Sequence, residues 1–325
     1  MADYEYEQYV TTPENLKSKI EEYGVAIIPN ILNESEIEDM KTGMWNTFEH
    51  ITADFEKPIK KNDETSWKEF HKLYPIHSML YQHWGVGHAQ FYWNIRQNPK
   101  VINTFAKLWE VEQDELLTSF DGLSFHLPHE VTKRGYYRNN QWLHTDQSFT
   151  RNDFECVQSW ITAYDVNEGD ATLTFLEGSH KVHKDFAEKF SMKDKNDWLK
   201  LNKNEHYDYY INEKGCVQKC IKCPAGSMVF WDSRTIHSGR EPDKNRENKN
   251  FRMIVYICMT PRSLAPPRIL SKRINAFENK RLTTHWPHKG KLFGKNPRTY
   301  GADLPNCKEL PTPELNDIGR KLVGY

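Results

Sequence analysis

The sequence predicts a mainly β protein with flanking helices, whose strands form a sandwich or a barrel. Beyond the first third of the chain, short segments alternate between apolar and polar residues, as at 123–127 and 157–164. Glycine, asparagine, aspartate and proline separate these segments from further apolar runs at 171–176, 227–232 and 251–259. Many short strands with turn residues between them favour a sandwich or barrel over a parallel α/β sheet.

The part of the chain before this β region is predicted to be largely helical. It begins with one short strand, since Val25–Ile28 is a compact apolar run followed by a Pro-Asn turn. Asn33 and Glu36 form the pattern of a capping box, so a helix should begin there. A second helical stretch is expected over roughly 88–110, and the lysine-rich residues 54–75 are expected to form a loop or lid.

We expect the 325 residues to form one domain. It comprises a helical N-terminal part (1–119), a β core (120–260) and a basic C-terminal extension (261–325). Between residues 267 and 300, nine lysines and arginines stand against one acid. This basic tail has two interpretations, which are a solvated extension packed on the core or a surface for an anionic substrate or partner.

The composition argues against several classes of protein. The formal net charge is −1, so no global field favours nucleic acid or an acidic membrane. The first residues are acidic and lack the apolar stretch of a signal peptide, and no apolar run approaches the ~18 residues of a membrane span. Six cysteines are too few for a disulfide scaffold of this size, so we expect free thiols and a cytoplasmic protein.

A His-x-Asp tripeptide is the first sign of a metal site. Alternation along a strand places residues i and i+2 on one face, so both side chains can reach the same ion. The tripeptide occurs three times against about one expected by chance, which makes it weak evidence alone. His183 lies in a charged segment that resembles a helix start, and His206 lies in a polar stretch. His144 and Asp146 precede the strand-rich part of the chain and are therefore favoured.

A third ligand and an anion site follow further along the chain. His237 comes after an apolar strand and a turn, and two imidazoles with one carboxylate suit the ferrous iron of oxygenases. Arg252 lies in another apolar strand, where burying an arginine is costly without an anionic partner. The partner is either the distal carboxylate of 2-oxoglutarate, which a guanidinium grips well, or an internal Asp or Glu.

Together these segments resemble the phytanoyl-CoA dioxygenase family, which is built on a double-stranded β-helix, or jelly-roll, core. The resemblance makes 120–260 a jelly-roll core, and the matching segments occur in family order over roughly residues 23–260. They are Gly24–Leu32, Gln141–Gln147, Gln158–Tyr164, Thr172–Lys181, Ala225–His237 and Phe251–Arg252.

The resemblance also implies a function for the site. It makes His144, Asp146 and His237 the iron(II) ligands, Arg252 the anchor of 2-oxoglutarate and Trp160 a neighbour of that cosubstrate. The implied activity is that of a dioxygenase that uses O2 to hydroxylate a C–H bond of a small molecule, with release of succinate and CO2. Asp146 favours hydroxylation, because related halogenases lack this carboxylate.

Further pocket residues are predicted around these positions. Ser238 follows the distal histidine where the family carries a glycine, and its hydroxyl is a candidate contact for the cosubstrate. The candidates for the substrate pocket are Gln147, Gln158, Thr162 and Arg234. The basic tail favours a substrate that bears a phosphate or a carboxylate.

Two alternatives remain open at the level of sequence. Cys216, Cys220 and Cys223 have a spacing that resembles the iron–sulfur motif of radical SAM enzymes, although a zinc or redox role or unliganded thiols would also fit. The second alternative is a jelly-roll protein that binds metal or ligand without turnover.

Overall fold

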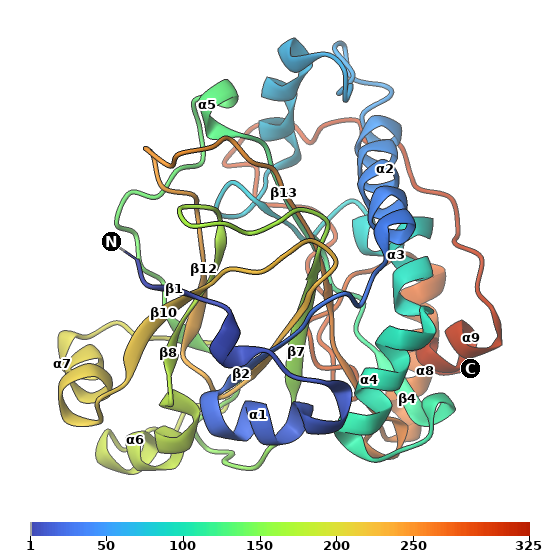
Figure 1. Cartoon of the computed structure of the whole chain (residues 1–325). Helices are drawn as coiled ribbons and strands as arrows, with labels where there is room; N and C mark the ends of the chain where they lie inside the picture. The colour runs from blue at the N-terminus through green and yellow to red at the C-terminus, as the bar shows by residue number, and fades with distance from the viewer. Residues whose placement is uncertain (1) are drawn as a thin grey trace.

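The computed structural model describes residues 2–325, and its strands form two six-stranded sheets (Figure 1). The first sheet has the order β1 (Tyr4–Glu5), β10 (Val217–Ile221), β8 (Thr172–Glu177), β12 (His237–Arg240), β6 (His144–Thr145) and β9 (Leu199–Lys200). The second has the order β2 (Val25–Ile28), β11 (Met228–Asp232), β7 (Val157–Thr162), β13 (Arg252–Ile257), β5 (Leu123–His126) and β3 (Leu80–Tyr81).

The two sheets pack face to face through apolar side chains. Leu173 and Phe175 of the first sheet contact a buried cluster that includes Trp160 and Ile254 of the second. Nearly all neighbouring strands within the sheets are antiparallel. This arrangement confirms the predicted jelly-roll core, in which alternate residues of each strand point between the sheets.

Helices cover the outer face of the second sheet and the ends of the sandwich (Figure 1). A third sheet of two strands, β4 (Leu116–Thr118) and β14 (Met259–Pro261), lies beside them. The helices are α1 (Leu16–Tyr23), α2 (Glu34–Ile51), α3 (Gln90–Arg96), α4 (Pro99–Trp109), α5 (His129–Thr132), α6 (His183–Lys189), α7 (Asn204–Asp208), α8 (Pro267–Glu278) and α9 (Asp317–Val323). Among the described residues, no helix combines the length and the apolar character that crossing a membrane requires.

The N-terminal predictions are partly confirmed. The capping box is present. Asn33 Oδ1 accepts from the Glu36 amide at 2.9 Å, and Glu36 Oε2 accepts from the Asn33 amide at 2.8 Å. The expected stretch over 88–110 is two helices, α3 and α4. Proline at position 99 has no amide hydrogen and favours extended backbone in the residue before it, so the first helix ends there.

The expected loop or lid over residues 54–75 is confirmed only in part, because 54–63 form turns and irregular backbone but most of the rest is helical. Residues Glu64–Leu73 form a 3-10 helix whose apolar side chains pack on α2. Trp67, Phe70 and Leu73 are buried at a spacing of three residues, which is the repeat of this helix type. Of the lysines that made the segment look solvated, only Lys68 and Lys72 belong to this helix, and the others lie in the loop before it.

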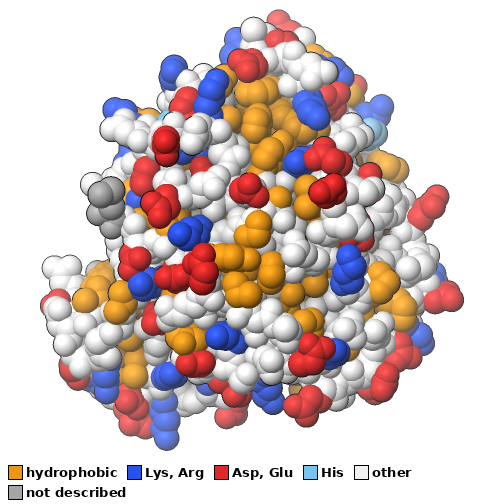
Figure 2. Space-filling model, viewed as in Figure 1, with side chains coloured by type: hydrophobic (Ala, Val, Ile, Leu, Met, Phe, Trp, Pro, Cys, Tyr) orange, Lys and Arg blue, Asp and Glu red, His pale blue; other side chains and the backbone are white. Residues whose placement is uncertain are grey.

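The basic C-terminal extension is an integral part of the packed structure. Arg273 on α8 is buried and donates to four backbone carbonyls, including those of Val323 and Pro287. Lys280 and Lys289 form ion pairs with Glu309 and Glu155. Positive and negative side chains are interspersed over the face shown in Figure 2. Two basic side chains of the tail are therefore paired with acids, and a third is buried among carbonyl oxygens.

Candidate metal centre

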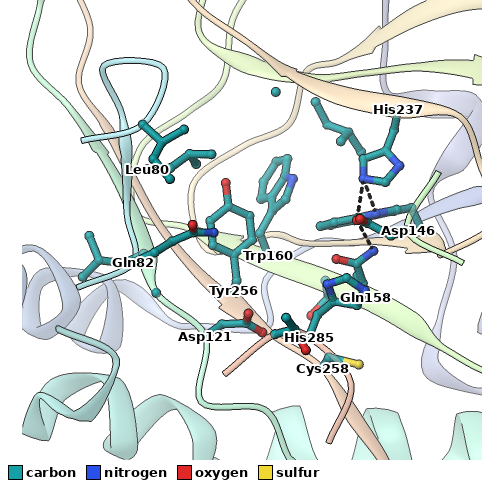
Figure 3. A pocket seen from close by; sticks show the side chains of 18 of the residues that line it. Leu80, Gln82, Asp121, Asp146, Gln158, Trp160, His237, Tyr256, Cys258 and His285 are labelled. Atoms are coloured by element: carbon teal, nitrogen blue, oxygen red, sulfur yellow. Dashed lines mark hydrogen bonds and ion pairs between the residues drawn. The ribbon is translucent and has the colours of Figure 1, made fainter. Parts of the chain in front are cut away.

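The register of two neighbouring strands brings the two predicted histidine ligands together. His237 on β12 lies directly opposite His144 on β6, and their ring centroids are 4.5 Å apart. Asp146 follows β6, and its amide donates to the carbonyl of Ser233 at 3.0 Å. Its carboxylate oxygens lie 3.6 Å from Nε2 of His144 and 3.2 Å from Nε2 of His237 (Figure 3).

Backbone carbonyls hold both imidazoles in the form that a metal needs. Nδ1 of His144 lies 3.0 Å from the Trp142 carbonyl, and Nδ1 of His237 lies 2.8 Å from the Thr235 carbonyl. A carbonyl only accepts hydrogen bonds, so each Nδ1 carries the proton and each Nε2 keeps its lone pair. Such partners fix the ring orientation of metal-binding histidines.

The charges of the cluster also fit a divalent cation. Burial lowers the pKa of His237, which keeps its imidazole neutral. Burial opposes ionisation of Asp146, but the neighbouring His285 and His144 hold the pKa of its carboxyl well below the usual value. Gln158 donates to Asp146 Oδ2 at 2.9 Å and orients it. Two imidazoles and one carboxylate, with ligand atoms within 4.8 Å of one another, are the donor set of ferrous oxygenases.

A cavity of about 400 Å³ opens in front of this cluster, between the two sheets. Its walls are mostly apolar and aromatic, with Leu80, Leu123, Trp142, Trp198, Tyr256 and Phe293 among them. Of the residues that the sequence predicted, six line it. They are His144, Asp146, His237, Gln158, Trp160 and Arg252.

Arg252 is fixed at the wall of this cavity. Its Nε donates to Ser124 Oγ at 2.9 Å and its Nη1 donates to the Ala171 carbonyl at 2.8 Å. The guanidinium carbon lies 5.8 Å from the centre of the Trp160 ring, and Trp160 Nε1 is buried without a hydrogen-bond partner. Within residues 2–325 no acidic side chain pairs with Arg252, so the internal partner considered above is not observed. A buried guanidinium without an acidic partner is destabilising, so Arg252 is suited to bind an anion from outside the chain.

Four other predicted residues do not line the cavity. Gln147 donates to the carbonyls of Arg151 and Asp153, and Arg234 pairs with Asp232 at 2.6 Å. The Thr162 hydroxyl donates to the Tyr164 carbonyl at 2.7 Å. Ser238 follows His237 on β12, and strand alternation directs it to the opposite face. Thr162 was predicted from strand alternation, which places it on the face of Trp160, but its hydroxyl is used within the chain.

Several cavity residues escaped the sequence analysis. The most consequential are Asp121, which lies between β4 and β5, and His285, which comes from the C-terminal extension. A signal for His285 was present, because Leu282 to Trp286 is a stretch without Lys, Arg, Asp or Glu within the basic tail. Trp198 was also missed, since it lies in a charged insertion.

The cysteine motif does not form a metal site. All six cysteines are free, and Cys216 and Cys223 belong to different hydrophobic clusters. In the part of the chain that the structure describes, the two histidines and Asp146 are the one group of three or more potential ligands that converges. The other His-x-Asp histidines are also accounted for, since His183 lies on α6 and His206 on α7.

A double-stranded β-helix that presents this donor set defines the class of non-haem iron, 2-oxoglutarate-dependent oxygenases. The chain belongs to the phytanoyl-CoA dioxygenase family, whose model matches residues 20–247. It is thus an oxidoreductase, and the metal and cosubstrates of its family are iron(II), 2-oxoglutarate and O2.

Similar proteins agree with this assignment. "Ava biosynthesis cluster protein O" of Aspergillus versicolor is 29% identical over 244 residues, which is 72% of this chain and 75% of the relative. The structure of a Salmonella typhimurium LT2 protein covers 98% of this chain and 86% of its own, with a TM-score of 0.61 and 14% identity. A hypothetical protein of Escherichia coli covers 98% and 85%, with a TM-score of 0.59 and 15% identity. The two structures support the fold.

Proposed function

We propose that the protein hydroxylates a C–H bond of a small organic molecule held in the cavity, with conversion of 2-oxoglutarate to succinate and CO2. The observation that carries the proposal is the direction of the His144, Asp146 and His237 side chains, which face a largely apolar cavity that also contains Arg252. A bound iron(II) would supply the redox chemistry that couples reduction of O2 to oxidation of 2-oxoglutarate and of the substrate.

Arg252 and Trp160 are suited to hold 2-oxoglutarate. The two hydrogen bonds to Ser124 and Ala171 fix the plane of the guanidinium, which can then bind the far carboxylate of a keto-diacid. The unpartnered indole N–H of Trp160 is available as a further donor. Both residues stand on the second sheet, across the cavity from the metal ligands on the first.

The apolar walls support an organic substrate with substantial aliphatic or aromatic surface. They also exclude water from the reacting centre, which limits side reactions. The A. versicolor relative is named as a biosynthesis cluster protein, which supports a biosynthetic intermediate as the substrate. The expected anionic substrate finds less support, because Arg252 is the one arginine or lysine among the cavity residues of the described chain.

Anaerobic reconstitution with iron(II) and 2-oxoglutarate, followed by exposure to O2, tests the proposal. We expect succinate formation that requires iron and rises when a true substrate is added. Asp146→Ala should remove iron binding and succinate formation, whereas Asp185→Ala, from another His-x-Asp tripeptide with an exposed aspartate, should keep both. Iron and 2-oxoglutarate binding without any succinate would instead indicate an inactive binding protein.

A cytoplasmic location remains part of this proposal. All six cysteines are free, and five of them are buried. Free thiols persist in reducing compartments. Fractionation of cells that express the tagged protein tests the location, and recovery from a secreted fraction would contradict it.

A further inference from the structure

A second polar group lies in the cavity near Asp146, outside the set of metal ligands. Asp121 and His285 both line the cavity, and Figure 3 shows them next to each other below Tyr256, away from His237. Asp121 is 9% exposed, and its Oδ2 has no hydrogen-bond partner. His285 Nε2 is also buried without a partner. Among the described residues these two side chains form no ion pair with each other, although each has an unused polar atom.

The backbone holds Asp121 in place. A Cβ at Gly87 would lie 2.0 Å from the Asp121 carbonyl oxygen, so only glycine permits this close approach. The same oxygen accepts from Arg96 Nη2 at 3.4 Å. On the other side, a Cβ at Gly122 would lie 1.9 Å from the Tyr81 carbonyl oxygen. The Asp121 backbone is thus confined on both sides and its carboxylate stays at the cavity.

The C-terminal extension is tied to the same place. Thr283 donates its amide to the Phe120 carbonyl at 2.9 Å, and its hydroxyl accepts from the Phe120 amide at 3.1 Å. Phe120 directly precedes Asp121, and Thr283 lies two positions before His285, so these two bonds hold Asp121 and His285 near each other. The pair is therefore a fixed feature of the fold, although its members are far apart in the sequence.

An unpartnered carboxylate in such a position is costly. Burial raises the pKa of Asp121 to about 6, while His285, Ser119 and Arg96 oppose that rise. Arg96 does not form an ion pair with the carboxylate in the described structure, since its terminal nitrogens donate to the carbonyls of Gly87 and Asp121. A buried polar atom without a partner destabilises the fold, and groups of this kind concentrate at functional sites.

The charges in the loaded cavity indicate what would bind there. The two positive charges of ferrous iron and the one of Arg252 offset the two negative charges of 2-oxoglutarate and the one of Asp146. Asp121 then remains as the one further acid among the described cavity residues, with His285 beside it. Tyr256 lies beside it and offers an aromatic face, which also attracts cations. A substrate complementary to this end carries positive charge and N–H donors.

We propose that Asp121 and His285 bind a cationic nitrogen group of the substrate and so orient its C–H bond toward the metal ligands. Asp121 accepts hydrogen bonds from the nitrogen, and Nε2 of His285 beside it is open to a further polar atom of the substrate. The proposal rests on the proposed function, because it concerns the substrate of that same site. It assigns a positioning role to the C-terminal extension and replaces the anionic substrate predicted from the basic tail.

Matched probes test the proposal on the full-length protein loaded with zinc(II), as a redox-inactive substitute for iron, and 2-oxoglutarate. The probes are phenethylamine, 2-phenylethanol and 3-phenylpropionate, which share a ring and differ in charge. Calorimetric titration should show the amine binding about tenfold or more tightly than the other two. Asp121→Asn should remove this preference while the alcohol binds as before, and the exposed Asp303→Asn should leave both unchanged.

The outcomes separate this proposal from the proposed function. An amine that binds no better than the alcohol, or that binds Asp121→Asn as well as the unchanged protein, would overturn the proposal and leave Asp121 as a structural, water-bridged group. If Asp121→Asn fails to fold, His285→Gln takes its place and should also weaken the amine. Iron(II) and 2-oxoglutarate together give a visible charge-transfer absorption band. If this band is absent from the unchanged protein, the proposed function itself is wrong.

Discussion

The two ends of the cavity differ in how their polar groups are satisfied. At the metal end, the two histidines donate to backbone carbonyls and Asp146 accepts from Gln158. At the other end, Asp121 Oδ2 and His285 Nε2 lack partners. At the first end, hydrogen bonds within the chain fix the side chains in position for a metal that stays bound from one turnover to the next. The second leaves groups open to a substrate, which must enter and leave.

The largest expected effect comes from removing a ligand at the metal end. His237→Ala leaves two protein ligands and should reduce iron-dependent succinate formation by about a thousandfold or more, because no other described residue can take its place. Iron binding in equilibrium dialysis and succinate release measure the effect. His71→Ala is the control, because His71 is exposed and does not line the cavity. A His237→Ala protein that still binds iron stoichiometrically would refute the role of His237 as a metal ligand.

A smaller effect is expected at Arg252. Arg252→Gln removes the charge that faces 2-oxoglutarate and should raise its KM about a hundredfold, the usual scale for a buried charged hydrogen bond. The KM for substrate should change much less. Arg234→Gln is a matched control, because Arg234 is paired with Asp232 and does not line the cavity. Equal KM values for 2-oxoglutarate in the two variants would refute the role of Arg252.

Sequence alone predicted which three side chains converge at the metal end, because the information for this convergence is largely local. His144 and Asp146 are two positions apart, and alternation along a strand fixes their common direction. His237 follows a recognisable strand and turn. What the sequence could not show is that β6 and β12 are direct neighbours, which depends on the order of strands in the sheet.

The other end of the cavity was not predicted for a related reason. Asp121 and His285 become neighbours through the Phe120–Thr283 hydrogen bonds, and no local pattern reports such a contact. The basic character of the tail was also a poor guide to its structure. It suggested that Arg273 is solvated, but Arg273 is buried among carbonyl oxygens. Side-chain direction outside regular strands depends on tertiary packing that composition does not record.

At the substrate end, the buried carboxyl of Asp121 should make the free energy of unfolding depend on pH. The folded protein binds a proton at Asp121 more tightly than the unfolded chain, because burial raises the pKa from 3.8 to about 6. The stability that Asp121 contributes is therefore full below pH ~4 and lost as the pH rises through ~6. Asparagine does not ionise, so Asp121→Asn should gain up to ~3 kcal/mol of unfolding free energy relative to the unchanged protein between these pH values.

Urea denaturation at several pH values from 4 to 7.5 measures this difference. The exposed Asp303→Asn serves as the control and should show no such pH-dependent gain. A difference between Asp121→Asn and the unchanged protein that stays constant over the range would mean that Asp121 is already paired, and the contrast between the two ends would disappear.

The smallest effect is expected for Gln158, which holds a metal ligand in place without being a ligand itself. Gln158 does not belong to the ligand set, but its amide donates to Asp146 Oδ2 and lies 3.3 Å from Ser233 Oγ. Gln158→Ala frees the carboxylate to rotate, and losing such a supporting bond typically weakens metal affinity by about tenfold to a hundredfold. Competition with a chelator measures iron affinity. Gln147→Ala is the matched control, because this glutamine adjoins Asp146 in sequence but donates to the Arg151 and Asp153 carbonyls. If both variants lose affinity equally, the effect reflects general loosening and not the orientation of Asp146.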